Sequence, residues 1–381
     1  AWRDLPPASY WAPHATAKAK LPGTIAMHGW RGGLLCCRND SPRRRLADEM
    51  LRTMLTSFVV VLSLHGAAAA ASASFGTHDY RQISISADGK SILWPDGRPM
   101  RLSPSSVSAF SQCPLLFRQR HIERLYEPAT PEFVTGVLVH ETLANLFALD
   151  REERRLDVAQ SLFREKWIRM RRVPKYGALF GLSEEENKHT HKRELRDVER
   201  ERTWGLKSLE ILRQYFTLED PARFDPIGIE EKMEVEIPES DVHGESGTII
   251  PLTGTFDRLD KDAQGELIVN DYKTGRSPSE YAMDMTGRPR MDSAFQQLEI
   301  YALMLSLQDR TPDKMRLIFL GDGATLERPV DDEMLERTAG TLRKVWSDMK
   351  RACQTGEYEC TCDGRACGRR SERGRGKFFP T

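Results

Sequence analysis

The sequence has no excess of charge of either sign, because 56 lysines and arginines balance 56 aspartates and glutamates among its 381 residues. It therefore lacks the global positive field that would indicate a nucleic-acid partner, although balanced totals still allow a local basic groove. The composition is ordinary for a globular protein, and a chain of this length can bury a large core. Net charge thus excludes no class of function.

Long apolar runs are missing as well, and the nearest approach to one lies in residues 50–75. This stretch contains Arg52, an apolar run at 58–64 and an A-x-A-like site at 71–73, which are the parts of a secretory signal. The run is too short and too interrupted for a transmembrane helix, so we expect no membrane partner.

A signal peptide works at an N-terminus, whereas this segment begins only at residue 50. We therefore expect residues 1–99 to be a poorly structured or non-native extension, and the functional protein to begin near Met100, where helical patterning starts. The alternative is export after initiation at Met50 or Met54, which would leave a new N-terminus near Ser74.

Cysteine is scarce, with seven residues, and it is unevenly distributed. Two cysteines stand near the start, one in the middle and four close to the end: Cys36, Cys37, Cys113, Cys353, Cys360, Cys362 and Cys367. A disulfide framework is typical of short secreted chains, whereas four cysteines bunched late in a long chain are more typical of metal ligands. The cysteine pattern therefore favours a metal site near the C-terminus.

Helical patterns dominate the first part of the chain beyond residue 100. Ser103 and Pro104 suit a helix cap and first turn, and the apolar spacing then predicts a helix through about Arg120. A second helix is predicted after Pro131. Residues 150–218 are charge-dense and helical in pattern, which predicts a solvated helical insertion.

The hydrophobic period changes to alternation at residue 228, and three strands are predicted up to the segment GELIVNDYK. A helix over 292–308, a strand in KMRLIFL, an extended segment in ATLERPV and a helix over 331–355 complete the pattern. This order predicts an α/β fold in which helices flank a central mixed sheet, in a domain spanning 100–358. The last residues, 359–381, form a tail rich in cysteine, arginine and glycine.

Two acidic residues, Asp257 and Asp271, stand at the ends of neighbouring predicted strands. Because adjacent strands lie about 4.8 Å apart, these carboxylates can converge on one hard cation. Lys273 lies two residues beyond Asp271 and therefore projects from the same side of its strand. A cation held by carboxylates beside an ammonium group suits phosphodiester hydrolysis. The D-x-K spacing alone has a simpler interpretation, in which two surface acids form a salt bridge with the lysine.

Three further polar residues fall on predicted helices. His140 can supply an imidazole ligand, although a histidine on an apolar helix more often packs in a core. Gln297 and Tyr301 are one helical turn apart, so both face the same side, where they can contact a phosphate or the lysine. Simple packing is the alternative for this pair too.

Five segments together resemble the RecB-type branch of the PD-(D/E)XK nuclease superfamily. They follow the family's order over about residues 102–355 and read LSPSSVSAFSQCPLLFRQRHIERL, GVLVHETL, GTFDRLD, VNDYKTG and QQLEIYA. The resemblance implies a restriction-endonuclease-like core with a helical insertion at about 150–218, and DNA as the substrate. It also implies that Mg2+ or Mn2+ is bound by His140, Asp257, Asp271 and the backbone carbonyl of Tyr272.

The remaining site residues take their roles from the same resemblance. Lys273 would be the catalytic lysine, acting with Asp257 and Asp271. Gln297 and Tyr301 match the family's Q-x-x-x-Y element, which positions DNA and the active site. The glycine that follows in VNDYKTG, Gly275, would let the chain turn away from the site.

The cysteines depart from the family's pattern. In its iron-sulfur members, one cysteine in the QCPLLF position joins three near the C-terminus, usually spaced C-x2-C-x5-C, to bind a [4Fe-4S] cluster. Cys113 matches the first position, but the tail has the shorter spacing CTCDGRAC. The resemblance implies a cluster on Cys113, Cys360, Cys362 and Cys367, with Cys353 as a substitute. Zinc and unliganded thiols are the other interpretations.

The function that these residues favour is a Mg2+- or Mn2+-dependent deoxyribonuclease, an exonuclease or a processor of ends and single strands in cytoplasmic DNA repair or recombination. A catalytically silent DNA-binding or scaffold subunit of a helicase–nuclease complex is the alternative, which the intact Asp257, Asp271 and Lys273 disfavour. A role in CRISPR spacer processing is also compatible with the resemblance. A third hypothesis, a secreted cysteine-containing interaction protein, is supported only by the signal-like segment at 50–75.

Two other patterns are missing from the sequence. It contains no internal repeat and no G-x-x-x-x-G-K-[ST] phosphate-binding motif, so it carries no ATP motor of its own. If the protein degrades DNA processively, a helicase must therefore come from another polypeptide.

Overall fold

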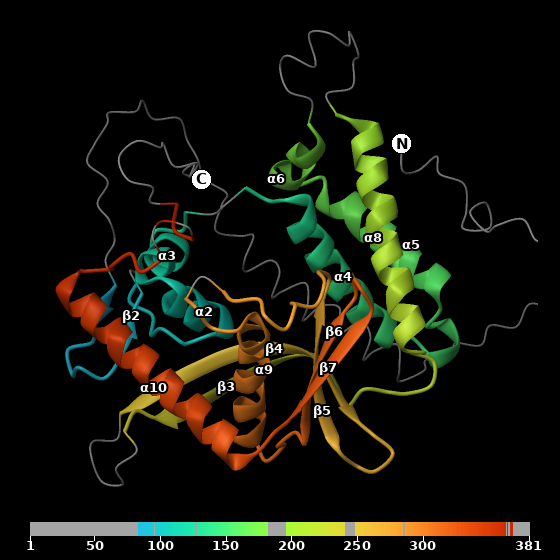
Figure 1. The fold of residues 1–381 in the computed structure, drawn as a ribbon. Coiled ribbons are helices and arrows are strands. Elements are labelled where there is room, and N and C mark those ends of the chain that lie inside the picture. Colours follow the sequence, from blue (N-terminus) through green and yellow to red (C-terminus); the bar gives the residue numbers. More distant parts are fainter. Residues whose placement is uncertain are drawn as a thin grey trace, which may run out of the picture. The chain divides into compact units, whose positions relative to one another are not determined.

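The computed structural model describes residues 83–368 except for 95, 126–127, 182–195, 241–247, 285, 363 and 365. The helices and strands, named as in Figure 1, follow in chain order. They are β1 (Ser84–Ile85), β2 (Ile92–Leu93), α2 (Pro104–Gln112), α3 (Pro114–Phe117), η2 (Arg118–Ile122), α4 (Pro131–Phe147), η3 (Arg151–Glu153), α5 (Leu156–Met170), α6 (Pro174–Gly177), η4 (Ala178–Phe180), α8 (Val198–Leu218), β3 (Gly228–Pro238), β4 (Ile249–Lys261), β5 (Leu267–Lys273), α9 (Arg290–Ser306), β6 (Lys314–Phe319), β7 (Ala324–Pro329) and α10 (Asp332–Thr355).

A five-stranded mixed sheet forms the centre of the fold, with the strand order β3-β4-β5-β6-β7. The pairs β3–β4, β4–β5 and β6–β7 are antiparallel, and β5–β6 is parallel. A parallel pair needs a crossover connection, which here contains α9. The predicted mixed sheet flanked by helices is therefore confirmed, as are the three-strand meander and the helices on either side of it.

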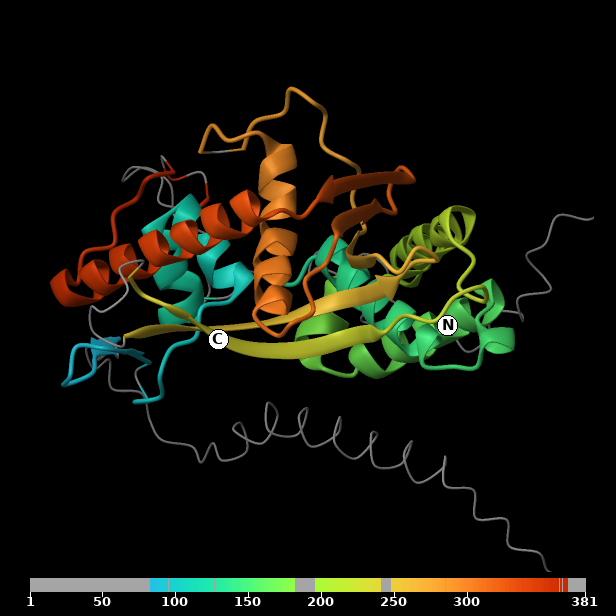
Figure 2. The same ribbon diagram turned by 90° about the horizontal axis from the view of Figure 1, so that it is seen from below.

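The two faces of the sheet bury different cores, as alternation along β6 shows. Met315, Leu317 and Phe319 belong to a core shared with α2, α9 and α10, whereas Ile318 and Leu320 belong to one shared with α4, α5 and α8. The charge-dense segment 150–218 is thus not only a solvated insertion, because its helices bury aromatic residues such as Trp167 and Tyr215. Figures 1 and 2 show these helices, in green and yellow-green, away from α10, in red.

The predicted helix through Arg120 is interrupted. The helix α2 ends at Gln112, Cys113 is extended with φ −170°, and Pro114 begins the separate short helix α3. Proline disfavours a helical conformation of the residue before it, which explains the break. The consequence is that Cys113 occupies the kink between two helices.

The domain begins earlier than the sequence predicted. Residues 83–99 were expected to be poorly structured or non-native, but β1 and β2 form an antiparallel hairpin. Ile83, just before β1, and Ile92, in β2, are both buried in the main core. The turn contains Gly89 at φ +72°, preceded by Asp88, and this Asp-Gly pair is a strong hairpin signal. Hydrophobic periodicity did not reveal the hairpin, because each strand is only two residues long. The expectations for residues 1–82, including the signal-like segment at 50–75, lie outside the described residues.

No helix in the described ranges is long and apolar enough to cross a membrane.

Candidate active site

Paired positions in β4 and β5 bring two carboxylates together, although Asp257 lies within β4 rather than at its predicted end, because the strand continues to Lys261. The ladder between these strands pairs Arg258 with Asn270, and the same register continued by one residue places Asp257 opposite Asp271. Both side chains are buried, with 8% of Asp257 and 1% of Asp271 exposed. Two like charges at neighbouring, buried positions are unfavourable unless a positive charge lies between or beside them.

Asp257 is held from two directions. Its Oδ1 lies 3.2 Å from Nδ1 of His140 in α4, and its Oδ2 accepts a 2.8 Å hydrogen bond from the backbone N–H of Tyr272. Burial alone would lower the pKa of His140, but the hydrogen bond and charge of Asp257 outweigh burial and raise this pKa to about 9. The imidazole is therefore protonated at neutral pH and compensates the carboxylate.

Asp271 pairs with the lysine two residues further along β5, because Nζ of Lys273 lies 2.6 Å from its Oδ2. Apart from this ion pair, neither carboxylate oxygen has a hydrogen-bond partner among the described residues. Burial raises the pKa of Asp271 above its ordinary value, although the Lys273 ammonium acts in the opposite direction. A buried carboxylate with so few partners has its lone pairs available for a cation.

Lys273 is held in place by α9. Its Nζ donates a 3.1 Å hydrogen bond to Oε1 of Gln297, whose Nε2 in turn donates to the hydroxyl of Tyr301 at 3.0 Å. Burial, followed by the charges of Asp271 and Asp257, raises the pKa of Tyr301 to about 12. The phenol therefore keeps its proton at neutral pH and has it available to donate.

Two adjoining hollows open on these residues. One, of about 390 Å3, is lined by His140, Asp271, Lys273 and neighbouring residues. The other, of about 430 Å3, has no acidic residue in its lining. Besides Lys273, its lining includes hydroxyl and amide side chains: Ser103, Ser105, Ser108, Thr255, Ser293, Gln296, Gln297 and Tyr301. Lys273 and Gln297 line both hollows, so the ammonium group lies where they meet.

The turn after β5 requires a glycine at position 321 rather than at position 275, where the sequence analysis expected it. A Cβ on Gly275 would meet nothing within 4 Å, so the turn after Lys273 does not depend on that glycine. A Cβ on Gly321 would lie 2.6 Å from the carbonyl carbon and oxygen of Gly275, because the backbones pack directly here. Gly321 N–H also donates to Gly275 O at 3.0 Å, which ties the end of β6 to the turn after β5.

Arg258 supports the strand that carries Asp257. It is 1% exposed, and its guanidinium donates to Glu219 at 2.7 Å and 2.8 Å, to Asp260 at 3.1 Å and to the Tyr272 hydroxyl at 2.6 Å. These contacts join β4 and β5 to the end of α8. The helical insertion therefore stabilises the active-site strands through buried charge as well as through its apolar core.

One residue near the site was missed by the sequence analysis. Among the described residues, one ligand atom each from His140, Glu230 and Asp257 lies within 4.8 Å of the other two, and Asp271 is outside this group. Desolvation, followed by the charge of Asp257, raises the pKa of Glu230 to about 7. The sequence did not single out Glu230, because it stands in a strand rich in glutamate and is followed directly by Glu231. Only the register of β3 against β4 shows that Glu230, and not Glu231, lies opposite Asp257.

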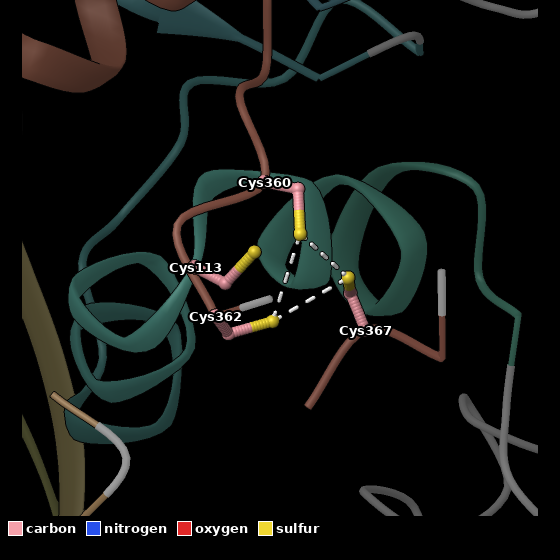
Figure 3. Close-up of side chains that lie close together, drawn as sticks. All are labelled: Cys113, Cys360, Cys362 and Cys367. Atoms are coloured by element: carbon pink, nitrogen blue, oxygen red, sulfur yellow. Dashed lines mark hydrogen bonds between the residues drawn. The ribbon is translucent and has the colours of Figure 1, made fainter. Parts of the chain in front are cut away.

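A second group of potential metal ligands lies at the kink after α2. The sulfurs of Cys113, Cys360, Cys362 and Cys367 all lie within 4.8 Å of one another and point toward a common centre, as Figure 3 shows. The sulfur of Cys360 is 3.8 Å from that of Cys362 and 3.3 Å from that of Cys367. The sulfurs of Cys362 and Cys367 are 3.5 Å apart. The structure thus brings together the four cysteines predicted for a metal centre.

The local backbone favours thiolate at this cluster. Burial opposes ionisation of Cys362, but backbone N–H groups of Cys367 and Ala366 lower its pKa to about 6. The proposed substitute ligand is not part of the group: the sulfur of Cys353 lies 3.6 Å from the hydroxyl of Tyr358, and burial raises its pKa. Cys353 faces away because it belongs to α10, whereas the other three cysteines of the tail follow that helix.

Four thiolates suit either a single tetrahedral ion or an iron-sulfur cluster. With zinc–sulfur bonds of about 2.3 Å, a tetrahedral site places its sulfurs about 3.8 Å apart, close to the separations found here. A [4Fe-4S] cluster would require the sulfurs to move apart. The donor set therefore fits both metals, and the spacing of the sulfurs resembles that of the mononuclear site.

Comparison with known proteins gives one extensive match. The family model described as "PD-(D/E)XK nuclease superfamily" matches residues 101–371. No curated protein matches the chain. Among solved structures, a protein from Eubacterium rectale named "Putative exonuclease" is similar with a TM-score of 0.41 and 10% identity, over 72% of this chain and 90% of that one. A protein named SSO0001 is similar with a TM-score of 0.24 and 18% identity, over 56% of this chain and 85% of that one.

Proposed function

Because the chain belongs to the PD-(D/E)XK nuclease superfamily, we propose that it is a Mg2+- or Mn2+-dependent deoxyribonuclease that hydrolyses phosphodiester bonds. The observation that carries this proposal is the buried pair Asp257 and Asp271 with Lys273 2.6 Å from Asp271, at the edge of a cavity of about 390 Å3. Carboxylates and an ammonium group in this arrangement suit a reaction in which negative charge develops on a phosphoryl group.

The residues present fit a divalent cation. Apart from the ion pair with Lys273, the carboxylate oxygens of Asp271 have no hydrogen-bond partner among the described residues, and Asp257 comes next to Asp271 on the adjoining strand. We assign the cation to Asp257, Asp271, His140 and the backbone carbonyl of Tyr272, because oxygen donors and an imidazole suit Mg2+ or Mn2+. When bound, the metal would polarise a phosphoryl oxygen and lower the pKa of a bound water.

The protein's own groups orient the reactants. Lys273 offers its ammonium group to the scissile phosphate, and Gln297 holds that ammonium by a 3.1 Å hydrogen bond. Tyr301 accepts from Gln297 at 3.0 Å and keeps its own proton to donate to a phosphate oxygen. Each of these hydrogen bonds reduces the freedom of Lys273 before substrate arrives.

The hollow next to the cation site supports a nucleic-acid substrate. Its lining of serine, threonine and glutamine side chains carries no acid, and Lys273 is the charged group of that lining. Such a surface can accept a phosphate backbone through hydroxyl and amide donors. We propose that DNA ends or single strands are processed here, in repair or recombination, with a separate helicase where degradation is processive.

The four-cysteine group supports a second, structural metal centre. We propose that Cys113, Cys360, Cys362 and Cys367 hold either a [4Fe-4S] cluster, as the family resemblance implies, or zinc. Contacts beside the sulfurs already join the two segments: Leu115 N–H donates to Glu359 O at 3.3 Å, and the Thr361 hydroxyl donates to Gln112 O at 3.2 Å. A metal would therefore fasten the tail to the kink between α2 and α3.

The test is cleavage of end-labelled single- and double-stranded DNA by the full chain in Mg2+, Mn2+ or EDTA, beside Lys273→Ala. We expect cleavage with either metal, none in EDTA, and loss of cleavage in the variant with DNA binding retained. Binding without metal-dependent cleavage by the wild type would refute the nuclease and support the alternative, a catalytically silent DNA-binding subunit.

A further inference from the structure

The backbone of Tyr272 serves the proposed cation site at two points. Its N–H donates to Oδ2 of Asp257 at 2.8 Å, and its carbonyl oxygen is one of the groups that we assign to the cation. Tyr272 also stands between Asp271 and Lys273 in β5, so its position affects where both neighbours leave the strand. A small rotation of this part of β5 would therefore misplace several groups of the site at once.

The side chain of Tyr272 points away from those of Asp271 and Lys273. Because side chains alternate along a strand, it projects to the opposite face of the sheet, where it packs in the core formed with α4, α5 and α8. Only 3% of the residue is exposed. Its ring meets that of His140 edge-on, with the ring centroids 6.0 Å apart and an angle of 89° between the planes. The ring thus also contacts the imidazole that pairs with Asp257.

A short hydrogen bond anchors the far end of this side chain. Nη1 of Arg258 donates to the Tyr272 hydroxyl at 2.6 Å. The guanidinium is itself fixed by hydrogen bonds of 2.7 Å and 2.8 Å to Glu219, the residue that caps the end of α8. Burial raises the pKa of Tyr272 above its ordinary value, so the hydroxyl is neutral when it accepts this bond. A side chain that only filled the core would need no hydroxyl, because a buried polar group is unfavourable without its partner.

We propose that Tyr272 is a positioning residue, whose hydroxyl contact with Arg258 sets the placement of its own backbone groups at the cation site. This inference rests on the proposed nuclease function and deepens it, because it names the contact through which the end of α8 acts on metal affinity. The link runs from Glu219 through the guanidinium to the Tyr272 hydroxyl, and along the rigid ring to the backbone of β5. Contacts that orient metal ligands in this way change metal affinity by about 10- to 100-fold.

A second tyrosine on the same guanidinium provides a matched comparison. Nη1 of Arg258 lies 3.3 Å from the Tyr215 hydroxyl, and the rings of Tyr215 and Tyr272 pack edge-on with centroids 5.8 Å apart. Tyr215 belongs to α8, whereas the proposed cation ligands belong to α4, β4 and β5. Removing the Tyr215 hydroxyl therefore perturbs the same network without the link to β5.

The test is the Mn2+ dissociation constant of the full chain without DNA, measured by electron paramagnetic resonance titration. Tyr272→Phe should bind Mn2+ about tenfold more weakly than wild type, whereas Tyr215→Phe should match wild type. Both variants should remain folded by circular dichroism in EDTA, because Arg258 keeps its ion pairs with Glu219 and Asp260 in either one. Wild-type affinity in Tyr272→Phe would overturn the positioning role. Equal weakening in the two variants would overturn it too, since a general loosening of the network would then be the cause.

A double-mutant cycle tests the link to α8. Glu219→Gln weakens the hold on Arg258 and should also weaken Mn2+ binding. If it acts through Tyr272, the double variant should bind Mn2+ no more weakly than Tyr272→Phe alone. Additive losses would overturn the link.

Failure of this inference is distinguishable from failure of the proposed function. A wild-type chain that binds Mn2+ and cleaves DNA, beside a Tyr272→Phe variant with unchanged Mn2+ affinity, would overturn the positioning role alone. A wild-type chain that binds no Mn2+ and cleaves no DNA would overturn both proposals.

Discussion

The backbone of Gly254 in β4 lies directly against the ring of Tyr301 in α9. A Cβ at position 254 would be 2.7 Å from Cε1 of Tyr301, closer than carbon atoms approach without displacement. Tyr301 is held by Gln297, and Gln297 also accepts from Lys273. A glycine in the sheet therefore determines how closely α9 can bring its polar residues to Lys273, the proposed catalytic lysine.

Gly254→Ala should displace the Tyr301 ring and disturb the hydrogen bonds that position Lys273. We expect cleavage to fall about a hundredfold with little change in DNA affinity, because a shift of about 1 Å in a positioning group has effects of this size. Gly136→Ala is the control, since its added Cβ would make only an ordinary 3.7 Å contact with Thr274. Wild-type cleavage by Gly254→Ala would contradict the positioning role.

Asp271→Asn should abolish metal-dependent cleavage. The substitution keeps the shape of a 1% exposed side chain but removes the charge that faces Lys273 and the proposed cation. DNA binding, measured by fluorescence anisotropy in EDTA, should remain near the wild-type value. Retained cleavage would remove Asp271 from the mechanism.

Arg258→Met should destabilise the protein by about 3–5 kcal/mol, because it leaves the buried carboxylate of Asp260 without its cation and the half-buried Glu219 with only the more distant Arg316, at 3.9 Å. The measurement is urea unfolding followed by circular dichroism. Arg213→Met is the control: Arg213 pairs with Glu210 on the exposed surface of α8, where a lost ion pair changes stability by about 1 kcal/mol or less. Equal effects of the two substitutions would contradict the role of the Arg258 network.

Cys113→Ser should lower the metal content and the thermal stability of protein purified without oxygen. Elemental analysis distinguishes iron from zinc, and a visible absorbance band accompanies an iron-sulfur cluster. Cys353→Ser should keep the wild-type metal content, because its sulfur faces Tyr358 rather than the other cysteines. Metal-free, colourless wild-type protein would argue for unliganded thiols.

Asp284 should make the segment between β5 and α9 sensitive to acid. Burial opposes ionisation, but hydrogen bonds from the Ser293 and Thr286 hydroxyls and from backbone N–H groups lower the pKa of Asp284 to about 2. A folded-state pKa below the ordinary 3.8 adds stability that is fully present above that ordinary value and is lost as the pH falls toward about 2. The difference in unfolding free energy between wild type and Asp284→Asn should therefore be largest near neutral pH and shrink below about pH 4. A difference that does not vary with pH would refute this assignment.

Much of the site could be predicted from the sequence because its signals are local. The D-x-K spacing places Asp271 and Lys273 on one side of a strand, and the helical spacing places Gln297 and Tyr301 on one helix face. In the structure, Nζ of Lys273 lies 2.6 Å from Oδ2 of Asp271, and Nε2 of Gln297 lies 3.0 Å from the hydroxyl of Tyr301. Short-range periodicity is enough for such pairs, since the distance between their members depends only on the element that contains them.

Contacts between distant segments could not be predicted in the same way. The single helix expected through Arg120 overlooked the break before Pro114, and the extension expected at 1–99 overlooked the hairpin that buries Ile92. Cys353 was considered as a ligand because spacing in the chain does not reveal which way a helix faces. These differences arise where packing, rather than periodicity, selects the conformation.

The sequence by itself determined the order of the main helices and strands beyond residue 100, the acidic residues and the lysine on neighbouring strands, and the family to which the motifs belong. Only the tertiary structure decided that Glu230, and not Glu231, lies beside Asp257, and that Cys113 meets Cys360, Cys362 and Cys367. The physical reason is that strand register and the closure of long loops depend on the simultaneous packing of both faces of the sheet. A shift of one residue in β3 would turn Glu230 away from the site without changing any local pattern.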